Sequence, residues 1–515
     1  MKITFTLIVL CFSLELMAQK AGTPDSSFGV DGKVLTSFPN SFPDCATAAT
    51  LSDGSIITVG TITFSNGIDT GGFLALKYSA NGVLDTTFGK GGMSLVKGTG
   101  TGQAIAIQAD DKIIIGGYGS NFSSSFISIA RVNAFGTIDS SFGNNGVILT
   151  NWGQNCHDIV IQKDGKILIF GEDNTSFITM RYLDNGALDQ TFGDGGIVKT
   201  SFGGPAENGN AIVLDPQGKI TVAGDDGESI LLARYNPNGT LDQSFGQEGK
   251  VISNLTNHID DIYDIALQPD GKIVAAGASS TFNKSNILVV RYLINGRLDS
   301  SFATNGFIVN KLPYNTLSKR LALQSDNKIV VCGYAISDSI YGHFLTERFL
   351  SNGTIDSSFN DSGYEITKMD QSDAANAIII QHDGKIVLAG DARETPPNPL
   401  LYLVALARYD NDETKKQIIV QKIKHYIQTH NNAQATTLNS LSIYPNPAQN
   451  VLHIQGLSSN AKLTVVDFNG SIAVSYELRA VSGVYNLNIA SLHAGNYLLK
   501  IETNGEVVTK QFVKE

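Results

Sequence analysis

The 515-residue chain is poor in cysteine, tryptophan and charge. It has four cysteines and one tryptophan, and Asp, Glu, Lys and Arg together make up 17% of it. Cys11 lies in an apolar N-terminal segment, which leaves Cys45, Cys156 and Cys332, an odd number without a local pairing pattern. We therefore expect no disulfide framework. Positive charge is also scarce, and the net charge of −11 argues against nucleic acid as a partner.

Long hydrophobic runs are missing as well. The N-terminal run from Ile3 to Leu14 follows Lys2 and is too short for a stable membrane anchor, and Ala18 offers a small residue for cleavage. These features predict a secretory signal peptide at residues 1–18. Cys11 admits a lipoprotein interpretation, which the bulky Leu10 before it disfavours. No other stretch is apolar enough to cross a membrane, so we expect no transmembrane segment in the mature protein.

Motifs of the common enzyme classes are absent too. The sequence has no HExxH, no G-x-S-x-G and no phosphate-binding loop, and its eight histidines are scattered. None of them stands at metal-ligand spacing. The sequence therefore indicates no metal and no cofactor, and it favours a protein that is not an enzyme.

Glycine, in contrast, is abundant at 52 copies, and three short elements each recur seven times at steps of 50 to 60 residues. The first is D-x-[ST]-F, which begins at Asp25, Asp85, Asp139, Asp189, Asp242, Asp299 and Asp356. The second is a tight turn at Asp53, Asp110, Asp164, Gln217, Asp270, Asp326 and Asp383. The third is a cation before an aromatic or apolar residue, at Lys77, Arg131, Arg181, Arg234, Arg291, Arg348 and Arg408. A repeat of this length suits one four-stranded blade of a β-propeller.

The residues around the tight turn predict two strands of each blade. Short apolar runs precede it, such as Ile159–Ile161 and Ile378–Ile380, and predict an inner strand buried on both faces. A glycine stands seven residues past the first residue of each turn, from Gly60 to Gly390. We expect a side chain there to collide with a neighbouring strand.

Spacing separates a uniform face from a variable one. The cation and the Asp of the next D-x-[ST]-F are eight residues apart in all six cases, whereas the distance from the turn to the cation varies. We expect an ion pair at the constant spacing. The alternative, a repeated calcium ligand, lacks the oxygen-rich loop that calcium requires. The Phe of the motif is predicted to lie in the core.

The two chain ends complement each other. The seventh unit stops at Arg408-Tyr409 without a D-x-[ST]-F strand, and the N-terminus has that strand with nothing before it, at Asp25–Phe28 and Val34-Leu35. Pairing the two ends completes one blade and covers two open strand edges. We therefore predict that the propeller ring, residues 19–410, closes in this way.

The repeats resemble the delta-60 repeat family of predicted extracellular propellers. The resemblance rests on LDQSFGQEGKVI at 241–252 and LQPDGKIVAAG at 267–277, repeated around the ring. Ala303 and Asn360 depart from the pattern where the family has glycine, and Lys77 departs where it has arginine. The resemblance implies an all-β, seven-bladed propeller and says nothing of an activity.

A different pattern follows a polar linker at residues 411–437. Residues 438–515 resemble the type A sorting domain of the type IX secretion system, on the motif residues Tyr444, Pro445, Asn446, Pro447, Asp467, Gly470, Gly495 and Tyr497. The resemblance implies a small β-sandwich that the type IX machinery reads, a bacterium of the Bacteroidetes type, and a protein that is secreted or held at the cell surface.

The irregular connections contain the candidate ligand-binding residues. They form two groups, Trp152, Asn155, His157 and Asp158, and His258, Asp260, Asp261 and Tyr263. Exposed aromatic rings beside amides and carboxylates are suited to holding a sugar ring, although loops are polar whatever their role. The leading interpretation is a monomeric binding or adhesion module for an extracellular glycan or protein. A polysaccharide lyase or hydrolase on a propeller scaffold and a structural surface protein are the alternatives.

Overall fold

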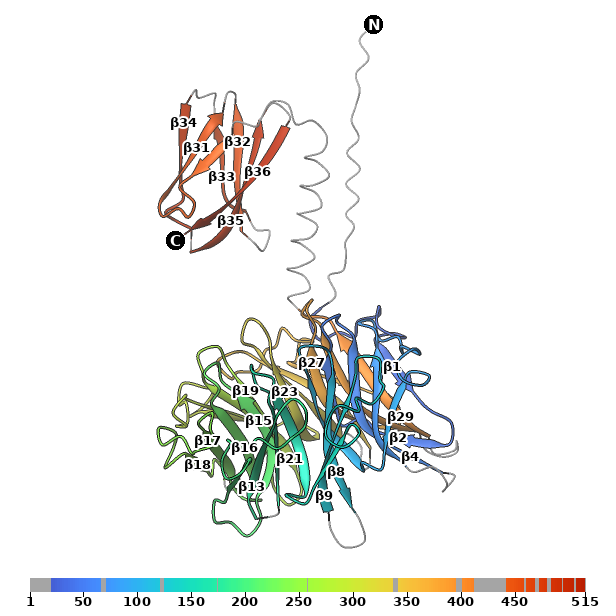
Figure 1. Ribbon diagram of the computed structural model, residues 1–515. Coiled ribbons are helices and arrows are strands. Elements are labelled where there is room, and N and C mark those ends of the chain that lie inside the picture. Colours follow the sequence, from blue (N-terminus) through green and yellow to red (C-terminus); the bar gives the residue numbers. More distant parts are fainter. Residues whose placement is uncertain are drawn as a thin grey trace. The chain divides into compact units, whose positions relative to one another are not determined.

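The computed structural model describes residues 20–514 apart from gaps at 66–70, 121–124, 174, 257, 337–340, 395–400, 412–440, 458–459, 468–471, 479–482, 493 and 504–505. The predicted signal peptide and residues 412–437 of the predicted linker lie outside the described residues. The chain divides into two compact units at Asn411/Asp412. All regular elements among the described residues are β-strands (Figure 1). None of the described segments is a helix long and apolar enough to cross a membrane.

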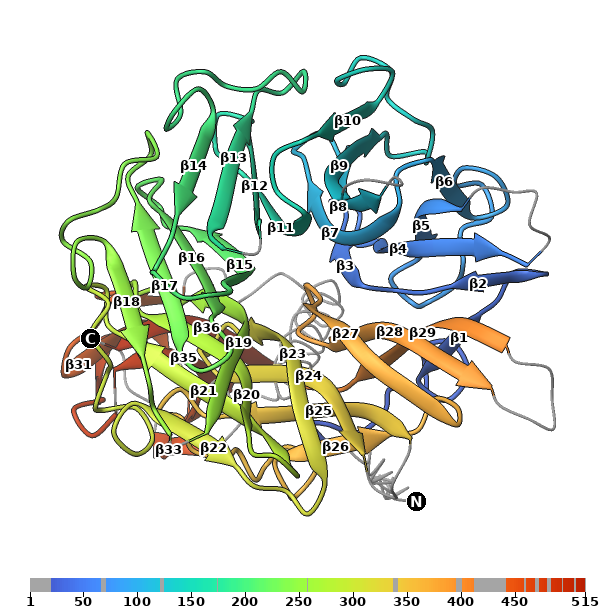
Figure 2. The same cartoon turned by 90° about the horizontal axis from the view of Figure 1, so that it is seen from below.

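The first unit is a ring of seven antiparallel sheets, the blades, numbered here along the chain (Figure 2). Blade 1 has β2 (Ser41–Pro43) and β3 (Thr47–Thr50) against β4 (Ile56–Phe64), followed by β5 (Gly72–Tyr78) and β6 (Met93–Lys97). Blade 2 has β7 (Thr101–Ile107), β8 (Ile113–Ser120), β9 (Ser125–Val132) and β10 (Val147–Thr150). Blade 3 has β11 (Asn155–Ile161), β12 (Ile167–Glu172), β13 (Phe177–Tyr182) and β14 (Ile197–Thr200).

The remaining blades repeat this order. Blade 4 has β15 (Asn208–Leu214), β16 (Ile220–Asp225), β17 (Ile230–Tyr235) and β18 (Lys250–Ser253). Blade 5 has β19 (Ile259–Leu267), β20 (Ile273–Ser280), β21 (Ser285–Tyr292) and β22 (Phe307–Asn310). Blade 6 has β23 (Asn315–Leu323), β24 (Ile329–Ile336), β25 (Gly342–Phe349) and β26 (Tyr364–Thr367). Blade 7 has β27 (Ser372–Ile380), β28 (Ile386–Glu394), β29 (Leu401–Tyr409) and the N-terminal β1 (Lys33–Thr36).

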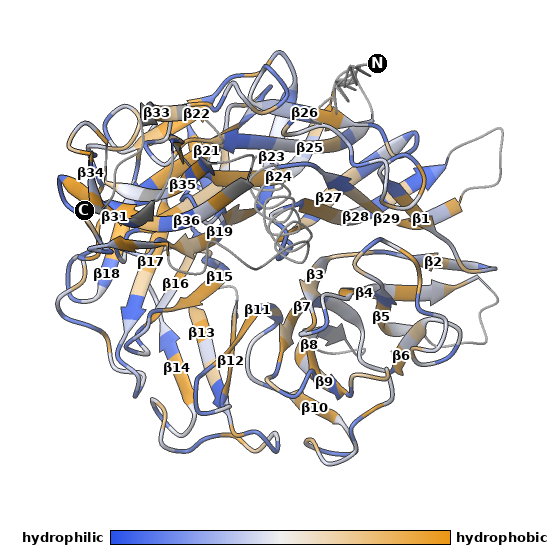
Figure 3. Ribbon diagram, turned by 90° about the horizontal axis from the view of Figure 1, so that it is seen from above, coloured by the Kyte–Doolittle hydropathy of each residue, from blue (hydrophilic) through white to orange (hydrophobic). Residues whose placement is uncertain are grey.

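Burial differs from the sequence prediction in one respect. The inner strands β11 and β27 mix buried and partly buried residues, so the prediction of a strand buried on both faces is wrong for both. Their inner side borders the central channel, whereas β12, β13, β16 and β17 lie between neighbouring strands and are buried throughout. Figure 3 shows hydrophobic residues concentrated in the strands and hydrophilic ones in many connecting turns.

The glycine seven residues past each turn is confirmed as a steric requirement. A Cβ on Gly171 would lie 1.8 Å from the Asn155 carbonyl oxygen, and one on Gly390 would lie 1.9 Å from that of Ala374. Both oxygens belong to the adjacent inner strand, and a real Cβ does not approach so closely. Only glycine therefore lets the two strands pair at this point.

In six of the seven blades, an arginine ties the blade to the next one. In blade 3, Arg181 Nε donates to Asp189 Oδ2 at 2.8 Å, and Nη1 donates to the Pro237 carbonyl oxygen of blade 4 at 2.6 Å. The guanidinium lies 4.5 Å from the centre of the Phe192 ring, which is fully buried. We call this set of Arg, Asp and Phe the clip. The predicted ion pair at eight-residue spacing is thus confirmed, and so is the buried Phe.

The clip recurs around the ring. Arg–Asp pairs of 2.7–2.9 Å join the residues Arg131 to Asp139, Arg234 to Asp242, Arg291 to Asp299, Arg348 to Asp356 and Arg408 to Asp25. Blade 1 has a weaker version, because Lys77 Nζ lies 3.9 Å from Asp85 Oδ2 and Asp85 is 32% exposed. Lysine lacks the planar fork that lets arginine hold a carboxylate and a carbonyl at once.

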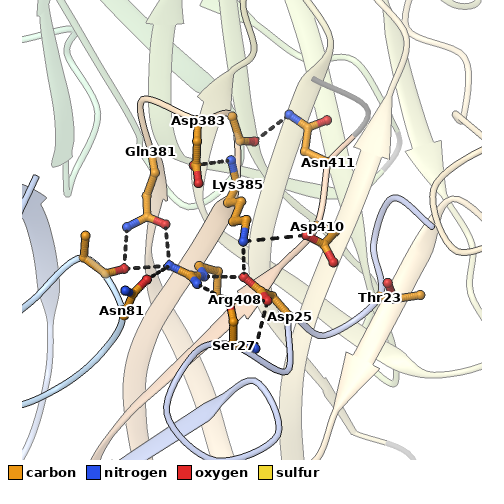
Figure 4. Close-up of polar contacts among 12 residues, drawn as sticks. Thr23, Asp25, Ser27, Asn81, Gln381, Asp383, Lys385, Arg408, Asp410 and Asn411 are labelled. Carbon is orange, nitrogen blue, oxygen red and sulfur yellow. Dashed lines mark hydrogen bonds and ion pairs between the residues drawn. The ribbon is translucent and has the colours of Figure 1, made fainter. Parts of the chain in front are cut away.

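The seventh clip joins the two ends of the ring, as predicted. β1 pairs antiparallel with β29, with Lys33 opposite Ala407 and Thr36 opposite Val404. Asp25 accepts hydrogen bonds from Arg408 and Lys385, while Arg408 also donates to the Ala80 carbonyl oxygen of blade 1 (Figure 4). Burial opposes ionisation of Asp25, but the bonds from Lys385 and Ser27 and the charge of Arg408 outweigh it and lower its pKa to about 2.

The second unit is a β-sandwich. One sheet has the order β30 (Ser442–Tyr444), β31 (Val451–Leu457) and β34 (Gly483–Asn488). The other has β33 (Ile472–Leu478), β32 (Ala461–Asp467), β35 (Gly495–Thr503) and β36 (Glu506–Lys514). The two sheets share one apolar core that includes Leu452, Leu463, Leu487, Leu499 and Phe512.

The motif residues of the second unit hold its two ends together. Asn446 donates from Nδ2 to the Gln511 carbonyl oxygen at 3.1 Å, and its Oδ1 accepts from Val513 N at 2.8 Å. The prolines at 445 and 447 flank this contact. Tyr497 is buried and stacks on Phe512 at 5.6 Å between ring centres. Gly470 lies outside the described residues, as does the side chain of Asp467.

Removing the closing segment is expected to destabilise the ring strongly. Deleting residues 19–38 eliminates β1 and Asp25, and leaves Arg408 without its carboxylate, whereas Lys385 keeps Asp410 at 3.9 Å. Asp25→Ala isolates the second effect and is expected to cost about 3–5 kcal/mol, because it leaves the buried Arg408 unpaired. Urea unfolding followed by circular dichroism measures both losses.

Asp85→Ala is the matched control, since Asp85 occupies the same motif position in the weak blade 1 clip. It is expected to cost only about 0–1 kcal/mol. Equal losses for Asp25→Ala and Asp85→Ala would show that the closing clip has no special weight.

Candidate functional site

The inner strand of the blades carries a β-bulge at a constant position. The pairing with the second strand skips one residue in blades 2 to 7, and the skipped residues are Gln103, His157, Asn210, Tyr263, Lys319 and Asn376. In blade 1, Pro43 pairs with Ile62 and Thr47 pairs with Val59. Four residue steps on the inner side therefore lie opposite three on β4, and Ala46 occupies the position that corresponds to the bulge. A bulge redirects a side chain that regular alternation would place elsewhere.

All seven bulge residues line one cavity of about 400 Å³ at the central channel. We call these residues the channel ring: Ala46, Gln103, His157, Asn210, Tyr263, Lys319 and Asn376. Asp44, Cys45, Thr101, Arg320 and Asp391 also line the cavity. The ring contains one residue from each blade, and six of the seven side chains are polar.

Three ring residues are held by an acid of their own blade. His157 Nε2 lies 3.1 Å from Glu172 Oε2. Asn210 and Asn376 donate to Asp225 and Asp391 at 3.0 and 2.8 Å. The acid stands 15 residues after the ring residue in each pair and directly follows the invariant glycine. The two asparagines also donate to carbonyl oxygens of the next blade, those of Ile262 and Cys45. The acids therefore orient the ring side chains.

Blades 1, 2, 5 and 6 differ, because Thr61, Tyr118, Ala278 and Tyr334 stand where blades 3, 4 and 7 have the acid. Lys319 Nζ lies 5.4 Å from the centre of the Tyr263 ring. Burial lowers the pKa of Lys319, the charge of Arg320 lowers it further, and Asp391 opposes them. Arg320 Nη1 donates to the carbonyl oxygens of Tyr263 and Lys319 at 3.2 Å each.

Three acids of the channel, Asp44, Asp225 and Asp391, have raised pKa values. Burial raises the pKa of Asp44 to about 6 against the bond from Thr61 N, and the charge of Asp391 adds to the rise. Burial raises the pKa of Asp225 to about 6 although Asn208 and Asn210 donate to it, and Asp261 contributes. Burial likewise raises the pKa of Asp391. These carboxyls contrast with those of the clips, whose pKa values are lowered.

The structure brings two of the sequence-predicted site residues, His157 and Tyr263, to the cavity. Asp261 lies near it as a partner of the Tyr263 hydroxyl at 3.4 Å. Asn155 donates to Glu172 Oε1 at 2.6 Å, next to His157.

The other sequence-predicted residues lie apart from the cavity or serve the backbone. Asp158 accepts hydrogen bonds from Ile159 N and from Ile212 N of blade 4, at 2.8 and 2.9 Å. Asp260 is fully buried and accepts from Leu255 N and Thr256 N. Trp152 is 59% exposed on a connection, and His258 is exposed.

Sequence reasoning missed Gln103, Asn210, Lys319, Asn376 and Ala46, although a signal for them exists. Each ring residue stands seven residues before the first residue of its tight turn, as Asn210 stands before Gln217. Aligning the repeats on that turn would have selected the ring. Among the described residues, no three His, Cys, Asp or Glu side chains meet in a way that could hold a metal ion.

The raised pKa values predict that the buried acids of the site lower the stability of the fold, and that this loss depends on pH. Between the unfolded pKa of 3.8 and the folded pKa of about 6, the unfolded state releases the Asp225 proton first, so Asp225 lowers the stability as pH rises. The effect of Asp225→Asn on the free energy of unfolding, variant minus wild type, should therefore be more stabilising at pH 7 than at pH 3. The difference between the two pH values should be on the order of 1–3 kcal/mol. Urea titrations at both pH values measure the difference, and a pH-independent effect would contradict the assignment.

Known families match both units. Residues 108–142, 162–192, 216–245, 268–302 and 324–359 match the family described as "Domain of unknown function (DUF5122) beta-propeller". Residues 442–515 match the "Secretion system C-terminal sorting domain". No curated protein matches the chain.

Solved structures that resemble the chain share little sequence with it. A protein of unknown function from Dyadobacter fermentans has 10% identity and a TM-score of 0.42, with 74% of this chain and 98% of that one covered. Virginiamycin B lyase from Staphylococcus aureus has 12% identity and a TM-score of 0.36, with 61% and 85% covered. PorZ, a surface component of the type IX secretion system of Porphyromonas gingivalis, has 10% identity and a TM-score of 0.27, with 92% and 82% covered.

The family matches agree with the ring of seven blades and with the β-sandwich that follows it. The sorting domain implies recognition by the type IX secretion machinery and export to the cell surface or the medium. The chain is a seven-bladed β-propeller protein with DUF5122 repeats and a C-terminal type IX secretion sorting domain.

Proposed function

We propose that this exported propeller is a binding protein whose ligand, a saccharide or another small polar molecule, occupies the mouth of the central channel. The observation that carries the proposal is the channel ring: a constant bulge turns one side chain from every blade toward one cavity. Its volume of about 400 Å³ falls in the range of pockets for small molecules, about 300–1,000 Å³.

The chemistry of the ring supports a polar ligand. Asn210, Asn376 and His157 are held by carboxylates, so they are preorganised donors and acceptors. Tyr263 adds an aromatic ring, to which the C–H face of a sugar can bind. The scaffold residues vary little from blade to blade, whereas the ring residues differ. Variable polar residues held on a rigid scaffold are where a binding function is expected to lie.

A polysaccharide-acting enzyme, a hydrolase or a lyase, is the second candidate. The observation that favours it is the pair Asp44 and Asp391, which line the same cavity. Burial and the charge of Asp391 raise the pKa of Asp44 to about 6, and glycoside hydrolysis uses a pair of carboxyl groups of which one is held protonated. Release of reducing ends or unsaturated products that is lost in Asp44→Asn and Asp391→Asn would favour the enzyme over the binding protein.

Filling the cavity is expected to abolish binding. Ala46→Trp adds bulk at the smallest ring position without removing a polar group, and Tyr263→Ala removes the aromatic ring. In a saccharide array followed by calorimetry, both variants should lose at least tenfold in affinity, about 1.4 kcal/mol, while their melting temperatures show that they fold.

Trp152→Ala distinguishes the channel from the connection at 151–158. Loss of binding in Trp152→Ala, with retention in Ala46→Trp, would move the site to that connection. If the wild type binds nothing on the array, a structural surface role becomes the better interpretation.

We further propose that an N-terminal signal peptide and the C-terminal sorting domain act in sequence, the first for the inner membrane and the second for the outer membrane, in a bacterium of the Bacteroidetes type. Deleting residues 438–515 should leave the protein in the periplasm, because the type IX machinery then has no sorting domain to recognise. Cell fractionation with immunoblotting measures this, and normal amounts of truncated protein in the medium would contradict it.

A further inference from the structure

The acids around the cavity are already engaged by donors of the protein. Glu172 accepts from Asn155 and lies 3.1 Å from His157 Nε2. Asp225 accepts from Asn208 and Asn210, at 2.8 and 3.0 Å. Asp391 accepts from Asn376, and Asp44 accepts from Thr61 N at 2.6 Å. A ligand that offers only hydrogen-bond donors would compete with these contacts.

Lys319 is in the opposite situation. In the described part of the chain, no carboxylate lies within ion-pair distance of its Nζ and no hydrogen bond from it is formed. The Tyr263 ring lies 5.4 Å from Nζ, and the charge of Asp391 acts on it only from a longer distance. The other cavity cation, Arg320, donates to two carbonyl oxygens of its own wall. Lys319 therefore brings an ammonium with three free donors to a partly buried site, where an anion would be its natural partner.

Position in the repeat strengthens the argument. His157, Asn210 and Asn376 each have an acid 15 residues later, but at Lys319 this position holds Tyr334. The one blade with a cation in the ring is thus a blade without the acid that would neutralise it. Asp44 and Asp225 have pKa values of about 6, so just below that pH their repulsion of an anion weakens.

We propose that the ligand of the channel mouth is an acidic saccharide, whose carboxylate or sulfate group binds Lys319 while the sugar ring packs on Tyr263. This inference rests on the proposed binding function and specifies its ligand class. Carboxylate and sulfate share the chemistry that Lys319 recognises, and the geometry of a point charge does not select between them.

Calorimetry with three probes tests the proposal on the mature full-length protein at pH 5.5, below the pKa of about 6 of Asp44 and Asp225: a galacturonate hexamer, a sulfated galactose hexamer and a neutral galactose hexamer. At least one acidic probe should bind, and the neutral one at least tenfold more weakly. Lys319→Met, which keeps the length and removes the charge, should weaken acidic binding about 10- to 100-fold, the range for a hydrogen bond to a charged group. Lys319→Arg should restore part of it.

Lys311→Met is the matched control, because it removes the same charge from an exposed lysine at the end of blade 5 and should leave the affinity unchanged. Equal loss in both lysine variants, no loss in Lys319→Met, or equal affinity for the neutral probe would overturn the proposal. If the neutral probe binds as tightly as the acidic ones and Ala46→Trp abolishes that binding, the channel function stands and only the ligand class is wrong. If no probe binds, or if Ala46→Trp has no effect on binding, the channel function fails as well.

Discussion

The structure depends on the bidentate reach of one arginine in each of six blades. Its Nε holds the aspartate of the same blade, its Nη1 holds a carbonyl oxygen of the next, and its flat face lies on a buried phenylalanine, as with Arg181, Asp189 and Phe192. A buried ion pair by itself adds little net stability because both charges lose water. Its geometry is what matters here, since repeating one fixed contact between neighbours sets one angle between blades.

Blade 1 and blade 7 show what the ring tolerates and what it requires. Blade 1 has Lys77 in place of arginine and Ser55 in place of the turn lysine, and its clip is open to solvent. Blade 7 has a full clip assembled from the two chain ends, with Lys385 as a third member. A full clip, like those of blades 2 to 6, thus stands at the junction that has no covalent connection, where separation of the strands would otherwise begin.

The clips and the channel serve different purposes, and the pKa values of their carboxyl groups differ accordingly. At the clips, cations and hydroxyls lower the pKa of the aspartates, so these carboxylates stabilise the fold above about pH 4. At the channel, burial raises the pKa of Asp44 and Asp225, so these carboxyls reduce the stability at neutral pH. Groups that a fold retains at a cost are candidates for function, because a binding site must keep polar groups ready for a ligand.

The sequence alone determined the number of blades, the ion pair at eight-residue spacing, the closure by the N-terminal strand and the sorting domain. These features are local in the chain or repeat at a readable period, and each follows from the steric or electrostatic demand of a short motif. The channel ring was decided by the tertiary structure. His157 and Tyr263 drew attention as unusual residues, but Asn210, Lys319 and Asn376 resemble ordinary strand residues when read along the chain. A bulge breaks the two-residue alternation from which side-chain direction is inferred, and the ring joins residues more than 50 positions apart. Only closure of the seven blades around one axis brings those side chains to a common cavity.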